Sequence, residues 1–316
     1  MSDFMKNRSI TLILAPFMVL MILSSTSCVE RSLELRPEKV PLTLYMIWPE
    51  GQVVEGAMVY LYDSDGELYL KEKAPAKKFV KDVDPDTYKV LVTNSDYVNA
   101  TISDTASWET AVMHAMLKDP SLNQYESVKN VFTTGADNLK VVPGTLGEEE
   151  NVYAVYPENR VYLIKIKVLK YYAGTVKNMT VNMDGVVSSI RVKDGSDLND
   201  PTGIIGAEAE RIYESPQSSA DICRFAEGND PGDFLAEFSV FGWRGTNNVY
   251  IDIEYNDGKQ GKVDPVDITD VLEKFKKEGS EYVEVEIVIK LIDGGYITLV
   301  ISVEDWNTNT GTGTVI

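Results

Sequence analysis

Short segments in which apolar and polar residues alternate run through the chain from residue 42 to residue 303. In the clearest of them apolar side chains share one face and lysines point the other way: Tyr162, Ile164, Ile166 and Val168 against Lys165 and Lys167. Such period-two alternation predicts a half-buried strand. Similar segments lie at 42–48, 58–62, 67–70, 87–93, 176–183, 234–243, 249–255, 283–291 and 296–303. Many short strands with turns between them predict an all-β fold built of β-sandwiches.

Turn motifs connect several of these segments. Asp63–Gly66, Asn256–Gly258 and Gly294-Gly295 are typical of hairpin turns. We also expect segment 176–183 to pair with segment 161–171. One short helix is predicted over Val271–Lys277, with Asp270 as its N-cap and Gly279 just past its end.

Three stretches lack a clear strand pattern. Residues 107–117 are expected to form a short helix or a long excursion. Residues 119–150 are polar and contain Gly and Pro, which favours a connection, and residues 194–233 favour an extended loop or insertion. We therefore predict two sandwiches in tandem, an N-terminal domain over 28–155 and a C-terminal domain over 156–316.

The first residues have the composition of a secretory signal. Lys6 and Arg8 precede a 14-residue apolar run, Ile10–Leu23, and the small residues Ser24–Ser27 then lead to Cys28. A basic start, an apolar centre and small residues before a cleavage point are typical of an export signal, here residues 1–27. The run is shorter than the ~20 residues that span a bilayer. An ordinary export signal followed by a chance cysteine is the alternative.

The position of Cys28 makes this segment resemble the lipobox of bacterial lipoproteins. The resemblance implies cleavage before Cys28, acylation of its thiol and amine with chains such as palmitate, and attachment of the mature chain to the cell outer membrane. It also implies that the protein works outside the cytoplasm, with its folded part at the cell surface.

The net charge of the mature chain argues against nucleic acid and anionic lipid headgroups as partners. Without residues 1–27 the chain keeps 28 basic and 48 acidic side chains, a formal charge of −20. Such a surface repels nucleic acid and anionic headgroups.

Residues that commonly carry chemistry are scarce. The single histidine, His114, lies in an apolar stretch, so we expect a structural role rather than a general base. With Cys28 acylated, Cys223 is the remaining thiol and is expected to be buried. No catalytic residue, metal ligand set or cofactor motif is predicted. Two acidic turns, Asp63–Glu67 and Asp194–Asp200, only faintly resemble calcium loops and serve equally well as plain turns.

Eight landmarks stand in order along the mature chain: Cys28, Ile47-Trp48, Tyr88–Asp96, Val152–Pro157, Phe241-Gly242, Val266–Asp270, Gly294-Gly295 and Val303–Trp306. Their order and spacing resemble Bacteroidetes surface lipoproteins related to the fimbrillins and to the minor fimbrium anchoring subunits. The resemblance implies two tandem transthyretin-like β-sandwiches and a pilus or fimbrium subunit as partner. In such a family the pilins are expected to join by donating a strand to a neighbour's sheet, and the anchor members are expected to hold the polymer of pilins at the outer membrane.

These features predict a non-enzymatic fimbrial anchor, tip or accessory subunit, or an adhesin for a host or glycan ligand. A carbohydrate-binding lipoprotein of a glycan-uptake system is the alternative, and a β-sandwich hydrolase is a third class. The tail Asn307–Ile316 is either a donor strand or a frayed terminus. Asp104–Ala106 resembles the three-residue O-glycosylation acceptor of Bacteroidetes, which makes Thr105 a candidate glycosylation site. Trp108 and Trp243 are expected to pack in the core rather than to contact ligand.

Overall fold

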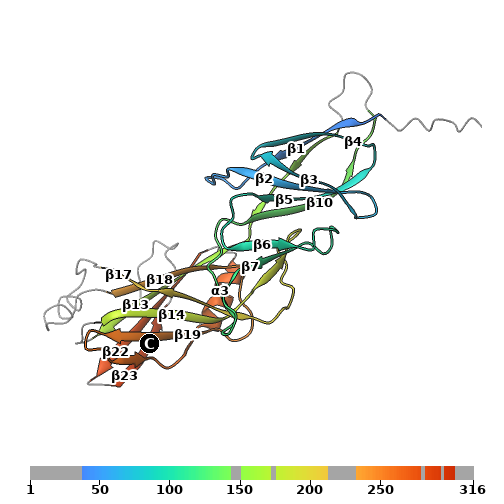
Figure 1. Cartoon of the computed structure of the whole chain (residues 1–316). Helices are drawn as coiled ribbons and strands as arrows, with labels where there is room; N and C mark the ends of the chain where they lie inside the picture. Colours follow the sequence, from blue (N-terminus) through green and yellow to red (C-terminus); the bar gives the residue numbers. More distant parts are fainter. Residues whose placement is uncertain are drawn as a thin grey trace, which may run out of the picture.

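The computed structural model describes residues 38–143, 151–171, 176–212, 233–278, 282–292 and 295–302. The signal segment 1–27, Cys28, Cys223, residues 303–306 and the tail Asn307–Ile316 lie outside these described residues, so the assignments made for them stay predictions. Within the described residues the chain consists of strands and one helix, which confirms the all-β prediction. The strands gather toward the two ends of an elongated molecule (Figure 1).

At one end a three-stranded sheet packs on a five-stranded sheet. The first has the order β11 (Val152–Val155), β1 (Val40–Met46) and β4 (Lys78–Val83). The second has the order β12 (Glu158–Asn159), β10 (Phe132–Lys140), β5 (Thr87–Asn94), β2 (Gly56–Tyr62) and β3 (Leu68–Pro75). Alternate residues of β1, Leu42 and Leu44, are fully buried against Val59 and Val90 of the facing sheet. Burial of these apolar side chains holds the two layers together.

At the other end a second pair of sheets encloses its own core. One sheet has the order β17 (Glu210–Ile212), β18 (Asp233–Val240), β13 (Tyr162–Tyr171), β22 (Tyr282–Ile292) and β23 (Gly295–Ser302). The other has the order β20 (Gln260–Lys262), β19 (Asn248–Tyr255), β14 (Val176–Val186), β16 (Gly203–Glu208), β9 (Gln124–Tyr125) and β8 (Leu117–Asp119), and β21 (Val266–Asp267) also pairs with β19. Ile164, Val181, Phe238 and Ile251 lie in the core between them, together with Trp243.

A third, small sheet lies between the two ends (Figure 1). It contains β15 (Ser189–Arg191), β7 (Val112–Ala115) and β6 (Ala100–Ser103). Its residues Met113 and Ile190 share an apolar core with Tyr60, Tyr62 and Leu91. The strands β2 and β5 are therefore buried on both faces, and the third core joins the two ends of the molecule.

Strands from both sides of residue 155 share three of these sheets. β7 pairs with β15, β9 pairs in parallel with β16, and β10 pairs with β12. The expected domain boundary near residue 155 stays a prediction.

The strand pairings that the three predicted hairpin turns require are present, and one of them joins β22 to β23 with Ile292 opposite Gly295. β2 and β3 pair across the Asp63–Gly66 turn, where one Asp63 carboxylate oxygen accepts the N–H groups of Asp65 and Glu67. β19 and β20 pair across the Asn256–Gly258 turn. Gly66 and Gly258 have φ of +85° and +81°, a backbone conformation that glycine adopts without a steric penalty.

Other expectations were wrong. Residues 119–150 contain the nine-residue strand β10, whose alternation is interrupted by an irregularity between Ala136 and Leu139. Residues 107–117 contain β7 rather than a helix, and residues 194–233 contain β16 and β17. The expected pairing of segments 161–171 and 176–183 is also wrong, because β13 pairs with β18 and β22 whereas β14 pairs with β16 and β19.

The predicted helix forms as α3 (Thr269–Glu278), but its cap differs from the expected one. The Asp267 carboxylate accepts the backbone N–H of Thr269 at 2.9 Å and its hydroxyl at 2.6 Å. Asp270 instead lies in the first helical turn, where a negative charge favours the helix dipole. Leu272 and Phe275 bury the inner side of this helix.

Candidate functional site

The three-stranded sheet at the N-terminal end carries apolar side chains on its solvent side. Tyr45, Ile47 and Val80 are 43%, 47% and 53% exposed, although alternate residues of the same strands are buried. Thr43 lies between Val80 and Val152 in the register of the sheet. We call Tyr45, Ile47, Val80, Val152 and Ala154 the outer face. On β4 the neighbour of Tyr45 is Lys78, whose ammonium group lies 5.3 Å from the centre of the tyrosine ring. Exposed apolar residues that gather on one side of a sheet are typical of an interaction surface.

β11 forms one edge of this sheet and pairs only with β1 among the described strands. The N–H of Thr43 donates to the carbonyl of Asn151, and the N–H of Ile47 donates to that of Val155. Because backbone groups alternate in direction along a strand, those of Val152 and Ala154 point away from β1, toward the free edge. β11 has no charged residue, whereas the edge strand β3 carries Lys and Glu side chains. Charged residues protect edge strands from pairing, and β11 lacks them.

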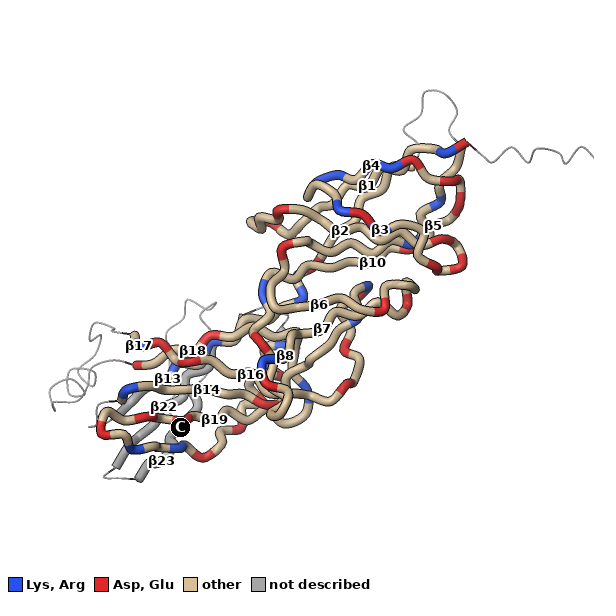
Figure 2. Tube along the Cα trace, viewed as in Figure 1, with Lys and Arg blue, Asp and Glu red and all other residues tan. Residues whose placement is uncertain are grey.

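A second candidate surface is a groove across the outer side of the sheet that runs from β20 to β8. Its volume is about 510 Å³. The lining residues come from six strands and one turn, and we call them the cross-strand groove: Lys118, Leu122, Gln124, Thr180, Asn182, Ile204, Gly206, Ala207, Glu208, Tyr250, Asp252 and Lys262. Figure 2 shows basic and acidic positions interspersed over the strands of this sheet.

Tyr250 is held in a defined orientation in this groove. Its hydroxyl donates to the Asp184 carboxylate at 2.8 Å, and the same carboxylate accepts the backbone N–H of Asn248 at 2.6 Å. The hydrogen bond to Asp184 raises the pKa of Tyr250 above its usual value, so the phenol stays neutral and keeps its donor role. The hydroxyl oxygen retains acceptor capacity for a ligand.

Gly206 allows two amide side chains to lie across the middle of the groove. The Gln124 Nε2 donates to Asn182 Oδ1 over a distance of 3.4 Å. A Cβ built on Gly206 would come within 2.0 Å of Asn182 Oδ1 and 2.9 Å of Gln124 Nε2. A glycine inside a strand often marks such a close approach.

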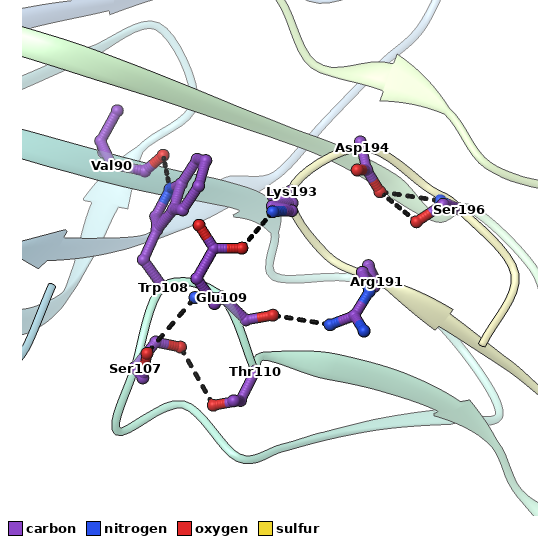
Figure 3. Close-up of polar contacts among 9 residues, drawn as sticks. All are labelled: Val90, Ser107, Trp108, Glu109, Thr110, Arg191, Lys193, Asp194 and Ser196. Atoms are coloured by element: carbon purple, nitrogen blue, oxygen red, sulfur yellow. Dashed lines mark hydrogen bonds and ion pairs between the residues drawn. The ribbon is translucent and has the colours of Figure 1, made fainter.

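Trp108 lies at the joint between the two ends of the molecule rather than in a ligand site (Figure 3). Its indole N–H donates a hydrogen bond to the Val90 carbonyl oxygen over a distance of 3.4 Å. The Lys193 and Lys89 ammonium groups lie 4.5 and 5.1 Å from its ring centre. Lys193 also pairs with the Glu109 carboxylate. The tryptophan therefore connects β5 with the segment after β15.

Trp243 is buried in the C-terminal core, as expected, and is 2% exposed. Its ring packs edge-on against Tyr162, with centroids 4.9 Å apart. It is not available to a ligand on the surface.

Thr105 lies in the turn after β6 and is half-buried. Its carbonyl accepts the Tyr62 hydroxyl at 3.1 Å, and the preceding Asp104 has φ of +52°. The backbone of the tripeptide is thus held in place by Tyr62. Glycosylation of Thr105 stays a prediction.

His114 lies between two serine hydroxyls that link β6, β7 and β15. Its Nε2 is 2.8 Å from Ser103 Oγ, and its Nδ1 is 2.9 Å from Ser189 Oγ. Because Ser103 donates its own proton to Asp104, we assign the imidazole proton to Nε2, with Nδ1 accepting from Ser189. No carboxylate contacts the ring among the described residues, so the arrangement differs from a Ser-His-Asp triad.

The two acidic turns use their carboxylates internally. The Asp63 carboxylate caps its own hairpin, as described above. In the second turn the Arg244 guanidinium donates to Asp197 at 2.9 Å and to Asn199 at 2.8 Å. Within the described ranges no group of three or more His, Cys, Asp or Glu side chains is placed to hold a metal ion.

No helix in the described part of the chain is long and apolar enough to cross a bilayer. Sequence reasoning did not identify either candidate surface. The outer face was not predicted because its residues belong to strands that also supply core residues, and the sequence pattern of those strands indicates only burial. The groove was not predicted because Leu122 and Gln124 come from residues 119–150, which were interpreted as a connection.

The chain matches one family model over most of its length. The model describes fimbrillin-A associated anchor proteins Mfa1 and Mfa2, and it matches residues 49–311. A comparison with curated protein sequences finds no match.

Several solved structures share the fold at low sequence identity. A proposed adhesin from Bacteroides thetaiotaomicron has a TM-score of 0.56 and 10% identity, covering 86% of this chain and 98% of that one. A proposed polysaccharide-binding protein from the same species has a TM-score of 0.55 and 10% identity, covering 85% and 97%. The fimbrial anchor protein Mfa2 from Porphyromonas gingivalis has a TM-score of 0.54 and 10% identity, covering 84% and 98%.

Proposed function

Because the chain belongs to the family of fimbrillin-A associated anchor proteins, we propose that it attaches fimbrial subunits to the outer membrane without performing catalysis. The family match over residues 49–311 carries this proposal. The outer face and the free edge of β11 support it, because an anchor needs an exposed surface for its partner.

The membrane end of the proposed anchor is Cys28. Acyl chains on one cysteine give stable attachment when more than one chain is present. Val40, the first residue of β1, lies twelve positions after Cys28. A chain of that length reaches at most about 40 Å. The N-terminal sandwich would therefore stay close to the membrane that holds the lipids.

The partner end is the free edge of β11. An extended segment of a fimbrial subunit would add a strand beside Val152 and Ala154, using their outward N–H and C=O groups. Its alternate apolar side chains would extend the outer face beyond Val152 and Ala154. Backbone pairing supplies affinity in such an arrangement, and the apolar side chains supply specificity.

Fractionation of sheared cells tests the anchoring role. The wild-type chain should be recovered with fimbriae in the outer membrane fraction, and Cys28→Ala should release both the chain and its fimbriae from the membrane. Recovery of wild-type protein in the membrane with no fimbrial subunit attached would contradict the proposal.

Two substitutions at one position test the β11 edge. Ala154→Pro removes the outward N–H, and edge positions tolerate proline because that N–H has no partner within the sheet. Ala154→Ser keeps the N–H and serves as the matched control. Binding of fimbrial subunits should fall at least about tenfold with proline, the loss expected from one backbone hydrogen bond and a steric block, and should persist with serine. Equal binding by both variants would remove β11 as the attachment point.

A second candidate function is glycan binding at the cell surface. The cross-strand groove favours it, because polar and apolar side chains converge there away from the β11 edge. This role is compatible with an adhesin and does not require an enzyme.

A further inference from the structure

We propose that the cross-strand groove binds a neutral oligosaccharide. The inference deepens the adhesin-like part of the proposed function and rests on it, but it does not depend on how fimbriae attach. It follows from the backbone pairing under the groove, from its balance of charges and from the fixed positions of its central side chains.

The floor of the groove cannot accept another strand. β14 is paired with β19 on one side and β16 on the other, and β16 is paired with β14 and β9. The backbone groups of these interior strands are therefore already used in the sheet. Six strands at about 4.8 Å spacing make the groove roughly 24 Å long, and it runs across the strands rather than along them. A ligand here must be recognised through side chains.

The charges in the groove balance. Lys262 and Asp252 are opposite each other on β20 and β19, and Glu208 lies beyond Thr180 in the same row. Lys118 belongs to β8, at the other end of the sheet. These four charged side chains are exposed and have no hydrogen bond or ion pair with another described residue. A polyanion would meet the two carboxylates, and a polycation would meet the two ammonium groups.

A neutral ligand with many hydroxyl groups avoids both repulsions. Each hydroxyl donates to one group and accepts from another, so carboxylates, ammonium groups and amides are all suitable partners. Hydrogen bonds to charged groups are also stronger than those between neutral groups. Neutral sugars have this chemistry, and they carry apolar C–H faces as well.

The apolar side of a sugar ring also finds partners here. Tyr250 presents a phenol ring whose hydroxyl is fixed by Asp184, and Ile204 lies in the same lining. Side chains such as tyrosine combine an apolar body with a polar tip. The amide pair of Gln124 and Asn182 adds donors and acceptors at the centre. The volume of about 510 Å³ is within the ~300–1,000 Å³ range of small-molecule sites.

The test uses the mature chain on an array of immobilised oligosaccharides. Neutral fragments of mannan, xylan, β-glucan and starch are compared with sialylated and sulfated glycans. The proposal expects binding to at least one neutral fragment, followed by calorimetric titration with that fragment in solution. Absence of binding to every neutral fragment, or binding only to sialylated or sulfated glycans, would overturn it.

Substitutions then locate the site. The double variant Asp252→Ala with Glu208→Ala should weaken binding of the fragment at least about tenfold, because each carboxylate contributes a charge-assisted hydrogen bond. Tyr250→Ala should have a similar effect. Asp264→Ala is the matched control, since Asp264 is exposed on the loop after β20 but does not line the groove. Unchanged binding by the double variant and by Tyr250→Ala, in proteins with wild-type thermal unfolding, would overturn the assignment.

Separate experiments test fimbrial attachment at β11 and oligosaccharide binding in the cross-strand groove, so one proposal can be contradicted without the other. Ala154→Pro should leave oligosaccharide binding unchanged, because β11 lies in the sheet at the opposite end of the molecule (Figure 1). The double variant in the groove should leave fimbriae attached. Loss of fimbrial subunit binding in the groove variant, with no oligosaccharide bound by the wild type, would assign the groove to a protein partner instead.

Discussion

Gly135 of β10 lies directly against the backbone of Lys193, in the segment that follows β15. A Cβ built on Gly135 would come within 2.7 Å of Lys193 Cβ and 2.9 Å of Lys193 Cα. Gly135 belongs to the N-terminal sandwich, and Lys193 follows the small sheet that lies between the two ends. Their contact is therefore part of the joint that the third apolar core forms.

Gly135→Ala should destabilise the protein by about 1–3 kcal/mol, because the added methyl group forces one side of the joint to move. Urea unfolding followed by fluorescence measures the change. Thr134→Ala on the same strand is the control and should cost less than about 1 kcal/mol. Equal effects of the two substitutions would show that the joint yields without strain.

The tryptophan at the joint should matter more than the ion pair beside it. Trp108→Ala removes the ring that two lysines and the Val90 carbonyl contact, and we expect a loss of about 1–3 kcal/mol. Glu109→Gln breaks the pair with Lys193, but the Glu109 side chain is 59% exposed. Exposed pairs contribute about 0–1 kcal/mol. Denaturant unfolding at low salt and at 1 M salt distinguishes the two contributions to stability. The loss of stability caused by Glu109→Gln should become smaller at high salt, whereas that caused by Trp108→Ala should not.

Alkaline pH should destabilise the same region. Burial, and then the nearby Tyr97, raise the pKa of Tyr60 from its ordinary value of 10.0 to about 12. Burial also raises the pKa values of Tyr62 and Tyr88. A raised pKa in the folded state means that the unfolded chain loses the proton first. The stability is thus complete below pH 10 and falls as the pH rises toward 12.

Thermal unfolding between pH 8 and pH 12 measures this dependence. Tyr60→Phe removes one titrating group, so the decline above pH 10 should become shallower in the variant. An unchanged slope would mean that Tyr60 titrates alike in both states.

The cap of α3 should contribute about 1 kcal/mol. Asp267→Ala removes the acceptor for the Thr269 hydroxyl and N–H, a loss of about 0.5–2 kcal/mol for a helix cap. Asp264→Ala changes a nearby exposed carboxylate without affecting the helix and serves as the control. The bond from Thr269 lowers the pKa of Asp267, so the contribution should be lost as the pH falls through that pKa.

Thr105 should carry a glycan if the tripeptide Asp104–Ala106 is an O-glycosylation acceptor. Mass spectrometry of the exported protein should find a mass increment on the Thr105 peptide that Thr105→Ala lacks. A bare peptide in the wild type would remove the site. The bond from Tyr62 to the Thr105 carbonyl does not involve the side chain, so the fold should tolerate the substitution.

The alternation of apolar and polar residues was sufficient to predict the strands of the two sandwich cores. Segment 161–171 forms β13, and its predicted inward residues Ile164, Ile166 and Val168 are fully buried. The hairpin at Asp63–Gly66 was equally predictable, since its turn needs a positive φ at glycine and an acceptor at aspartate. Both signals are local, and they depend on neighbours within a few residues.

The strand β10 shows where this reasoning stops. Most of its residues are polar or small and its alternation breaks at Ala136, yet it lies between β5 and β12. Only Phe132 and Leu139 supply large buried apolar side chains, so its own pattern is too weak to predict the backbone pairing with those strands. β7 and β9 are likewise short segments whose pairing partners, β15 and β16, lie far along the chain.

Period-two burial and turn chemistry are local properties, so the all-β class and the main hairpins could be predicted from the amino-acid sequence. Which strands share a sheet depends on tertiary structure. It alone placed Tyr45 beside Ala154 on the outer face, and Asn182 beside Gly206 in the groove. Residues that far apart in the chain meet only when the sheets close, so no local pattern reveals the surfaces that they form.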